Sequence, residues 1–390
     1  MPSRTDTVHG RWDPRFDALA EALAEEITGG GELGASIAVN IGGEVVADIW
    51  GGFADRAKNI PWRENTIVNF WSCTKTLTAL AALILVDRGA LDPFAPVASY
   101  WPEFAANGKQ HIEVRHLLSH TSGVSGWQTP FAEEHLYDWG EATSHLARQA
   151  PWWQPGTASG YHAMNYGHLI GELVRRITGR SLKDFVREEI AGPLAADVQI
   201  GARPEDAHRI AELVAPPPRD LGLARLAPDH PAVRTFGAFP PGARGVATAE
   251  TDVWRQADIG GANGHGNARG LVRALAPISL GGKSNGVRLL SSETIDVIFT
   301  EQSSGVDKVL SVPLRFGIGF GLPTPQSLPA IPDGRVCWWG GWGGSIVVMD
   351  TDRRATFAYV MNRMGQGTTG NARTNRYARL INEVIQDARA

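Results

Sequence analysis

One stretch of this sequence constrains the fold more than any other, because it predicts a helix that is apolar on nearly every side. Residues 76–87 read Thr-Leu-Thr-Ala-Leu-Ala-Ala-Leu-Ile-Leu-Val-Asp, and Gly89 follows as a stop signal. A helix with so little polar surface must be buried on most of its faces. The run is too short to span a bilayer, so it indicates the core helix of a globular protein.

Ser72 and Lys75 stand where this helix begins. A spacing of three residues on a helix puts both side chains on one face, close enough to touch. The first backbone N–H groups of a helix lack partners and favour negative charge. Acyl transfer needs at least a nucleophilic hydroxyl and a base beside it, and this position offers both a hydroxyl and an amine. The alternative is a solvated first-turn lysine, which fits less well at the mouth of an apolar helix.

Strand patterns occur near both ends of the chain. Near the start, a helical pattern precedes a predicted β-hairpin that turns at Gly42 and Gly43. Near the end, strand patterns precede a closing amphipathic helix that carries Tyr377 and Leu380. The predicted segments are a helix over 14–28, strands over 35–41, 44–50, 335–339, 345–349 and 355–361, and a further helix from 266.

The middle of the chain has a different character. Between residues 91 and 245 we expect short helices and loops with little strand pattern. The sequence therefore predicts an α+β fold, with an antiparallel sheet built from both termini and flanking helices. Residues 1–90 and 246–390 would form this sheet domain, and residues 91–245 an inserted, mainly helical domain. The active site would lie in the cleft between the two domains.

Composition excludes several classes of function. The chain has 390 residues, of which 43% are hydrophobic and 20% charged, and its net charge is −4, so nothing points to nucleic acid or an anionic membrane. The first twelve residues have no apolar core, so we expect no secretory signal and a cytoplasmic protein. Cys73 and Cys337 lie far apart, and we expect no disulfide and a buried, inert Cys73.

Two other patterns imitate functional motifs. His116 and His120 are four residues apart and could share a helix face as metal ligands, but no third ligand is evident. We interpret them as a helix end that runs into a Thr-Ser-Gly turn, and we expect neither metal nor cofactor. Gly282, Ser284 and Gly286 match the nucleophile elbow of α/β-hydrolases. Because no buried strand precedes Ser284 and no helix follows it, we interpret it as a turn residue.

At this point three elements in order resemble one superfamily. Ser72 and Lys75 form an SxxK motif, Tyr161 follows Pro-Gly-Thr as in a second motif, and Trp339-Gly-Gly resembles a third. The stretch 115–123 is similar to the family's helix and turn after the nucleophile segment. The sequence thus resembles the serine β-lactamase and penicillin-binding-protein superfamily, and within it the family VIII carboxylesterases. The resemblance runs from about residue 16 to residue 388.

The resemblance implies roles for these residues and a β-lactamase-like fold. Ser72 would be the nucleophile, activated by Lys75 and Tyr161, and an ammonium beside the phenol should lower the phenol pKa. The two groups would share one proton, so either could be the base. Trp339, Gly340, Gly341 and Trp342 would form an edge strand and substrate wall, with the backbone N–H groups of Ser72 and Trp342 at the oxyanion. A Gly-rich turn with packed tryptophans is the alternative interpretation.

Departures from the family pattern indicate the substrate. Ala163 stands where the second motif usually has Asn, and no Lys-Thr-Gly occurs. In β-lactam enzymes that lysine meets the substrate carboxylate, a contact worth about 1.5–3 kcal/mol. Trp339 replaces this charge with an aromatic wall, which favours small, neutral, apolar esters. Three further tryptophans near the motifs are candidates for an apolar pocket, namely Trp127, Trp152 and Trp153.

The leading hypothesis is therefore a cytoplasmic serine carboxylesterase that forms an acyl-enzyme on Ser72. Its expected partner is a small-molecule ester, with neither nucleic acid nor membrane involved. Alternatives on the same fold are a β-lactamase, a D-amino-acid peptidase or amidase, and an acyltransferase. A non-catalytic scaffold is the alternative from another class. It fits less well, because a scaffold has no need to keep Ser72, Lys75 and Tyr161 together.

Overall fold

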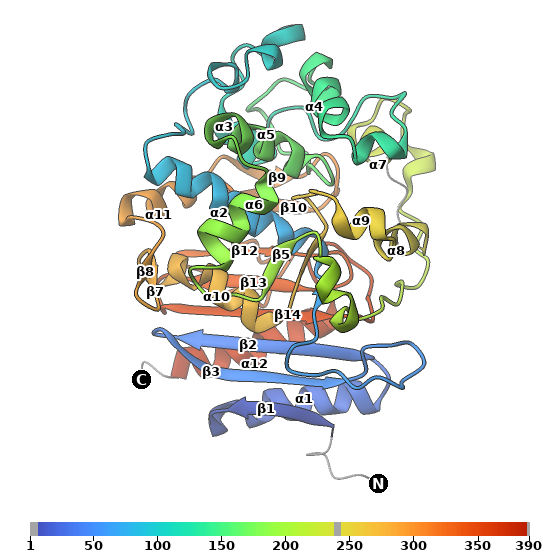
Figure 1. Ribbon diagram of the computed structural model, residues 1–390, viewed down its shortest axis with the longest axis vertical. Coiled ribbons are helices and arrows are strands. Elements are labelled where there is room, and N and C mark those ends of the chain that lie inside the picture. Colours follow the sequence, from blue (N-terminus) through green and yellow to red (C-terminus); the bar gives the residue numbers. More distant parts are fainter. Residues whose placement is uncertain (1–6, 238–242, 388–390) are drawn as a thin grey trace.

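A computed structural model describes residues 7–237 and 243–387 of the chain (Figure 1). Residues 1–6, part of the stretch in which we expected no signal sequence, lie outside it. The α-helices are α1 (Asp17–Thr28), α2 (Thr74–Asp87), α3 (Val114–Leu118), α4 (Trp139–Arg148), α5 (Tyr166–Thr178), α6 (Leu182–Val186), α7 (Pro231–Gly237), α8 (Ala243–Ala249), α9 (Asp252–Gln256), α10 (Ala268–Ser279), α11 (Ser292–Ile298) and α12 (Ala372–Asp387).

The strands gather into one large sheet and two small ones. They are β1 (Val8–Trp12), β2 (Gly34–Ile41), β3 (Glu44–Gly52), β4 (Val68–Asn69), β5 (Val198–Ile200), β6 (Gly264–Gly266), β7 (Lys283–Ser284), β8 (Val287–Arg288), β9 (Ser303–Val306), β10 (Pro313–Phe316), β11 (Gly321–Leu322), β12 (Val336–Gly340), β13 (Ile346–Asp350) and β14 (Ala355–Met361). Within the described residues, the large sheet has the order β1-β3-β2-β14-β13-β12-β11-β10-β9.

Strands from the two ends of the chain meet in the middle of this sheet. β2 pairs with β14 in antiparallel register from Ala35↔Met361 to Ile41↔Ala355. The hairpin of β2 and β3 turns at Gly42 and Gly43, whose φ angles of 63° and 103° suit glycine and favour the tight turn. The predicted α+β class, with a sheet built from both termini, is confirmed.

Helices cover both faces of the large sheet. Figure 1 shows α1 and α12 together on one face and α10 on the other. Four helices from the middle of the chain, α3, α4, α5 and α7, lie together at the opposite end of the molecule from β1. The two-domain division at residues 90 and 246 remains a prediction.

The apolar helix α2 is the core element that the sequence predicts. Every residue from Thr74 to Leu85 is buried, and α2 packs against α5, α6, α10 and α11. Such burial agrees with a helix that has almost no polar face. Among the described residues, no helix combines the length and the hydropathy that a membrane span requires.

Candidate active site

Ser72 lies on a tight turn at the entrance to α2. It occupies the middle of a 3-10 turn, η3 (Trp71–Cys73), and α2 begins at Thr74. Trp71 has a φ of 51°, a left-handed conformation that costs a non-glycine residue about 1–3 kcal/mol. The hydroxyl of Thr74 donates to the carbonyl of Trp71 and braces this turn. The backbone strain is thus located directly beside Ser72, which stays half-exposed at the end of the helix.

Lys75 is a buried amine that reaches back to Ser72. Its Nζ lies 3.2 Å from Ser72 Oγ and donates to the carbonyl oxygens of Ala163 at 2.8 Å and Gly261 at 2.6 Å. Burial lowers the pKa of Lys75 well below its ordinary value, because the protein interior disfavours the charged form. A neutral amine has two N–H groups and one lone pair. In that neutral form the two carbonyls would match the two N–H groups and leave the lone pair to the Ser72 hydroxyl.

Tyr161 completes the group of interacting side chains. Its hydroxyl is hydrogen-bonded to the Ser72 side chain and accepts a hydrogen bond from Trp339 Nε1 at 3.3 Å. Lys75 Nζ lies 4.7 Å from the centre of the Tyr161 ring. The expectation that an adjacent ammonium lowers the phenol pKa is wrong. Burial raises the pKa of Tyr161, so the same dry environment favours a neutral phenol beside a neutral amine.

Residues that the sequence analysis did not assign hold Tyr161 in place. The Tyr161 backbone N–H donates to Oδ1 of the buried Asp307, at 3.1 Å. The ring of His120 lies 5.0 Å from the Tyr161 ring and 6.0 Å from the Trp339 ring. His120 Nδ1 accepts from the backbone N–H of His162 at 3.1 Å, and burial lowers the pKa of His120 well below its ordinary value. His120 is thus a neutral packing partner of the tyrosine.

The third predicted element lies against the nucleophile turn, but not as an edge strand. Trp339 and Gly340 end β12, which lies between β11 and β13, so the edge-strand expectation is wrong. A side chain at Gly341 would place its Cβ 2.3 Å from the Phe70 carbonyl oxygen. Glycine therefore permits this close approach of the two backbones. The buried thiol of Cys73 adds a contact of 3.7 Å to the Trp339 carbonyl oxygen.

Trp342 lies in the turn that follows Gly341. Its ring is 4.8 Å from the Trp71 ring, edge to face. The backbone N–H groups on either side of it donate to Ser345 and Gly367, whereas no backbone acceptor of the Trp342 N–H is found within the described residues. The structure thus brings Ser72, Lys75, Tyr161 and Trp339 into one connected group, with Trp342 packed beside it.

The three predicted pocket tryptophans have other identifiable contacts. Trp127 is buried, donates to the Ala142 carbonyl oxygen at 3.0 Å and stacks on Phe131 at 4.6 Å. Trp153 donates to the Ala158 carbonyl oxygen at 3.0 Å. Trp152 Nε1 is buried without a hydrogen-bond partner in the described part of the chain. Their role in a substrate pocket remains a prediction.

His116, His120 and Ser284, whose spacing imitates functional motifs, have structural roles. His116 belongs to α3 and its Nδ1 accepts from the Glu113 backbone N–H at 3.1 Å, which caps the helix. His120 lies beyond that helix, with a φ of 62°, and so the two histidines do not share a helix face. Ser284 belongs to the short hairpin of β7 and β8, so a strand and not a helix follows it directly.

Neither cysteine forms a disulfide. Cys73 and Cys337 are both buried and free. Burial raises the pKa of Cys73 to about 12, so its thiol stays protonated at neutral pH. Cys73 is thus buried, as expected from the sequence, and its inertness remains a prediction.

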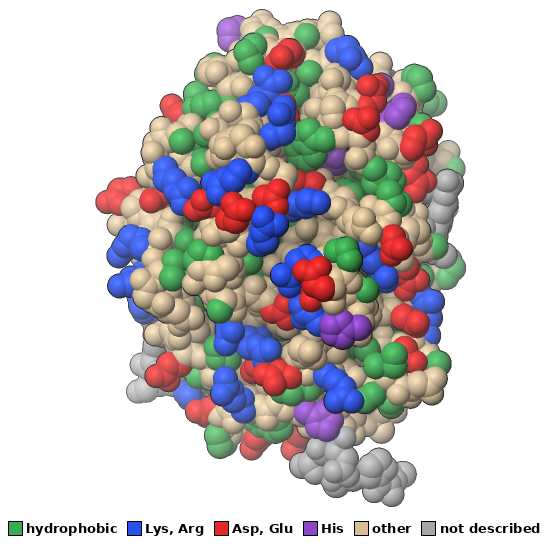
Figure 2. Space-filling model, viewed as in Figure 1, with side chains coloured by type: hydrophobic (Ala, Val, Ile, Leu, Met, Phe, Trp, Pro, Cys, Tyr) green, Lys and Arg blue, Asp and Glu red, His purple; other side chains and the backbone are tan. Residues whose placement is uncertain are grey.

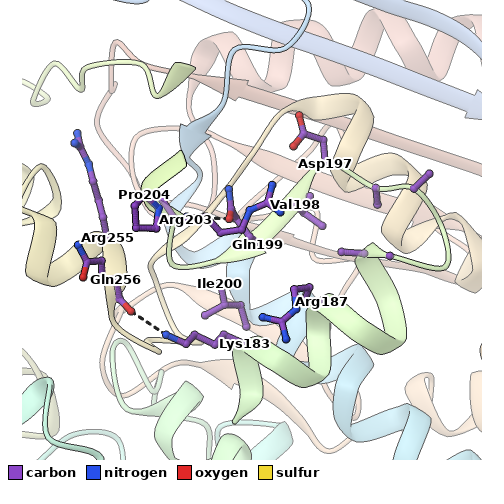
Figure 3. Close-up of a pocket in the computed structure, with 15 residues that line it drawn as sticks. Lys183, Arg187, Asp197, Val198, Gln199, Ile200, Arg203, Pro204, Arg255 and Gln256 are labelled. Carbon is purple, nitrogen blue, oxygen red and sulfur yellow. Dashed lines mark hydrogen bonds between the residues drawn. The ribbon is translucent and has the colours of Figure 1, made fainter. Parts of the chain in front are cut away.

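A surface pocket of about 560 Å³ lies elsewhere, between α6, β5 and α9 (Figure 3). None of the predicted site residues lines it. Its arginines include Arg187, paired with Asp184 at 2.7 Å, and Arg203, paired with Asp206 at 2.8 Å. These charges are neutralised locally, and the pocket offers no hydroxyl or thiol nucleophile.

Comparison with known proteins identifies the family. Over residues 16–381 the sequence matches the Beta-lactamase protein family. The chain belongs to the beta-lactamase family. Its relatives in that family include "Esterase/beta-lactamase LipL" of Mycobacterium tuberculosis, which is 36% identical over 374 residues, or 93% of this chain and 85% of the relative. "Esterase EstB" of Burkholderia gladioli is 31% identical over 255 residues, or 57% of this chain and 64% of that protein.

Solved structures similar to this beta-lactamase-family chain include a carboxylesterase and a penicillin-binding protein homologue. The crystal structure of a family VIII carboxylesterase is 35% identical and superposes with a TM-score of 0.90, covering 97% of this chain and 99% of that one. A penicillin-binding protein homologue from Caulobacter crescentus is 34% identical, with a TM-score of 0.88 and the same coverage. The β-lactamase-like fold and the family resemblance found in the sequence are therefore confirmed.

Proposed function

We propose that this protein is a serine carboxylesterase that hydrolyses small, neutral, apolar carboxylic esters through an acyl-enzyme on Ser72. One observation carries the proposal. The buried Lys75 amine donates to the carbonyls of Ala163 and Gly261 and lies 3.2 Å from the Ser72 hydroxyl. The named esterases among its relatives support ester hydrolysis.

Acylation begins with proton transfer from Ser72 to the lone pair of Lys75. Ser72 Oγ then attacks the ester carbonyl carbon and forms a tetrahedral intermediate. The Tyr161 hydroxyl, hydrogen-bonded to the Ser72 side chain, is in position to relay a proton to the departing alkoxide. The alcohol leaves, and the acyl group remains on Ser72 as an ester.

The negative charge of the intermediate needs hydrogen-bond donors that are already oriented. We assign this role to the backbone N–H groups of Ser72 and Trp342. Gly341 brings the Trp342 turn against the Phe70 backbone, immediately before the nucleophile turn. Hydrolysis of the acyl-enzyme repeats the sequence with water, which the same Lys75–Tyr161 pair deprotonates, and the carboxylic acid leaves.

Selectivity for neutral esters follows from Trp339. Its ring lies 5.2 Å from the Phe316 ring and 5.3 Å from the Tyr161 ring, so an apolar surface stands where β-lactam enzymes carry a lysine. Such a surface offers no charge to a substrate carboxylate. β-Lactam hydrolysis is the second candidate, because the relative from Mycobacterium tuberculosis is named both esterase and β-lactamase.

A substrate panel tests this function. Wild type, Ser72→Ala and Ser284→Ala are assayed with p-nitrophenyl esters of increasing acyl length and with nitrocefin. We expect wild type and Ser284→Ala to hydrolyse the short esters equally and nitrocefin far more slowly, and Ser72→Ala to lose both activities. A nitrocefin rate equal to the ester rate would contradict the ester preference. An active Ser72→Ala enzyme would contradict the mechanism.

A further inference from the structure

Two histidines and a glutamate converge at the surface of the middle region. His135 belongs to the 3-10 turn η6 (Glu133–Leu136), and Glu141 and His145 lie one turn apart on α4. One ligand atom of each side chain lies within 4.8 Å of those of the other two. His145 Nε2 lies 3.0 Å from Glu141 Oε1, as the i, i+4 spacing on a helix allows.

His135 also carries a ring nitrogen that the protein leaves without a partner. Its Nδ1 is buried and has no hydrogen-bond partner among the described residues. A buried polar atom without a partner costs about 1–3 kcal/mol, so such atoms are rare in folded proteins. The neutral imidazole nitrogen is a common metal ligand, so a metal ion bound at Nδ1 would supply the partner that the protein does not provide.

Phe131 holds the two imidazoles in place, and the nearby Arg148 is only weakly engaged. The Phe131 ring packs edge-on against His135 at 5.5 Å and against His145 at 5.4 Å. Arg148 is the cation paired with Glu141, at 3.9 Å, and its side chain is 64% exposed. A pair so distant and so exposed is weak, and an ion could displace it.

We propose that His135, Glu141 and His145 bind a divalent transition-metal ion of the Zn²⁺ type. Two imidazoles and one carboxylate suit Zn²⁺, whereas Ca²⁺ and Mg²⁺ prefer oxygen ligands alone. Neighbouring ligands of a tetrahedral Zn²⁺ lie about 3.3 Å apart, so binding draws the three side chains together. Water completes the coordination, because all three residues are partly exposed. From the sequence we expected no metal, and the proposed site departs from that expectation.

The bound ion would tie η6 to α4. The two helices are consecutive, and only residues 137–138 separate them. Phe131, which contacts both imidazoles, also stacks on Trp127 with an interplanar angle of 8°. The ion would therefore fix the loop between Trp127 and α4. This role is structural and separate from the reaction at Ser72.

Zinc titration of the purified full-length protein tests the site. Wild type, His135→Ala, His145→Ala and Glu141→Gln are titrated with ZnCl₂ in competition with a chromophoric zinc chelator. We expect wild type to bind one equivalent, and each variant to bind at least tenfold more weakly. Thermal unfolding with and without Zn²⁺ should show a rise in midpoint for wild type and little or none for His145→Ala.

His208→Ala is the matched control. His208 is exposed and its Nδ1 lies 2.8 Å from the carbonyl oxygen of Glu205, in its own turn. This variant should bind Zn²⁺ as wild type does. Circular dichroism checks that each variant is folded, and Co²⁺ absorption reports the coordination geometry independently of stability. Zinc binding that is equal in wild type and in the three site variants, or absent from wild type, would overturn the proposal.

Discussion

At the scale of single residues, two lysines are buried in similar surroundings but differ in their hydrogen-bond acceptors. Lys75 and Lys109 are both buried, both donate to backbone carbonyls, and burial lowers the pKa of each. Lys109 binds the carbonyl oxygens of Ala106, Ala147 and Gln149, and so it connects two segments of the chain. Lys75 has two such carbonyls and a serine hydroxyl in the third position, which in the proposed mechanism lets the amine act as a base.

Replacing Lys75 should therefore remove catalysis without moving Ser72. We expect Lys75→Ala to reduce kcat/KM by about 10²–10⁴-fold, the usual contribution of a positioned general base. In wild type the base acts when unprotonated, so kcat/KM rises with pH. Because burial lowers the pKa of Lys75, this rise should occur well below pH 10.5. Initial rates of p-nitrophenyl ester hydrolysis across pH measure both effects.

Lys109→Met is the matched control for this experiment. It removes an equally buried amine, whose pKa burial lowers to about 8, from a site outside the group around Ser72. We expect this variant to unfold more easily but to keep the pH profile of the wild type. A wild-type rate in Lys75→Ala would show that another group is the base.

At the scale of elements, the segment between α9 and β6 positions Lys75 through its backbone. Gly261 contributes the carbonyl that accepts from Nζ at 2.6 Å. A Cβ at Gly261 would lie 2.5 Å from the Met164 carbonyl oxygen, so this backbone cannot stay where it is once a side chain is added. The segment around Ala163 and the segment around Gly261, whose carbonyls both accept from Lys75 Nζ, are therefore packed directly against each other.

Gly261→Ala should therefore impair catalysis although it changes no reacting group. Displacement of the carbonyl would shift Lys75, and a misplacement of about 1 Å can cost roughly 10²-fold in rate. We expect kcat/KM for a short p-nitrophenyl ester to fall by about 10–100-fold. Gly237→Ala, where an added Cβ meets nothing within 4 Å, should be neutral. Equal rates in the two variants would mean that the Gly261 carbonyl is dispensable.

Local patterns in the sequence predict some elements of the fold well. Gly42 and Gly43 predict the hairpin because alternating apolar residues surround a turn that requires positive φ. β1 was not predicted, since only Val8 of its five residues is buried and the strand is held by pairing with β3. Strands formed by pairing at a sheet edge leave little pattern in the sequence.

The residues of the candidate site differ in how far the sequence alone predicts them. Ser72 and Lys75 follow from helix geometry alone, whereas Tyr161 and Trp339 needed the family resemblance because they come from distant segments. Asp307 and the carbonyls of Ala163 and Gly261 were not predictable. Every residue carries a backbone carbonyl, so its role depends only on where the fold brings it.

At the scale of the whole molecule, a buried charge cluster joins the two ends of the chain. Glu32, just before β2, is fully buried and lies 2.6 Å from Arg373 of α12. Tyr359 of β14 donates a hydrogen bond to the same carboxylate. Burial raises the pKa of Glu32 to about 7, and Arg373 offsets this only in part. The folded protein therefore binds the Glu32 proton more tightly than the unfolded chain does.

Stability should depend on pH through this carboxyl. Its contribution is complete below its unfolded-state pKa of about 4.5 and is lost as pH rises through about 7. We expect the free energy of unfolding of wild type to fall, relative to that of Glu32→Gln, by about 2.5 kcal/mol between pH 5 and pH 8. Urea unfolding at several pH values measures this difference. Glu64 is the exposed partner of Arg269, and Glu64→Gln should leave the pH dependence of the unfolding free energy unchanged. If the unfolding free energy of Glu32→Gln fell with pH as steeply as that of wild type, the assignment to Glu32 would be refuted.

The pairing of β2 with β14 also has a consequence for how the protein is made. Gly34 N–H donates to Oδ1 of Asn362, a residue 328 positions further along the chain. A ribosome adds about 5–20 residues per second, so β2 waits roughly 20–60 s for its neighbour. During that time one edge of β2 stays open to other strands. The large sheet can therefore close only once β14 has been synthesised, and a nascent chain stalled before residue 355 would carry Ser72 and Lys75 without a finished sheet beneath them.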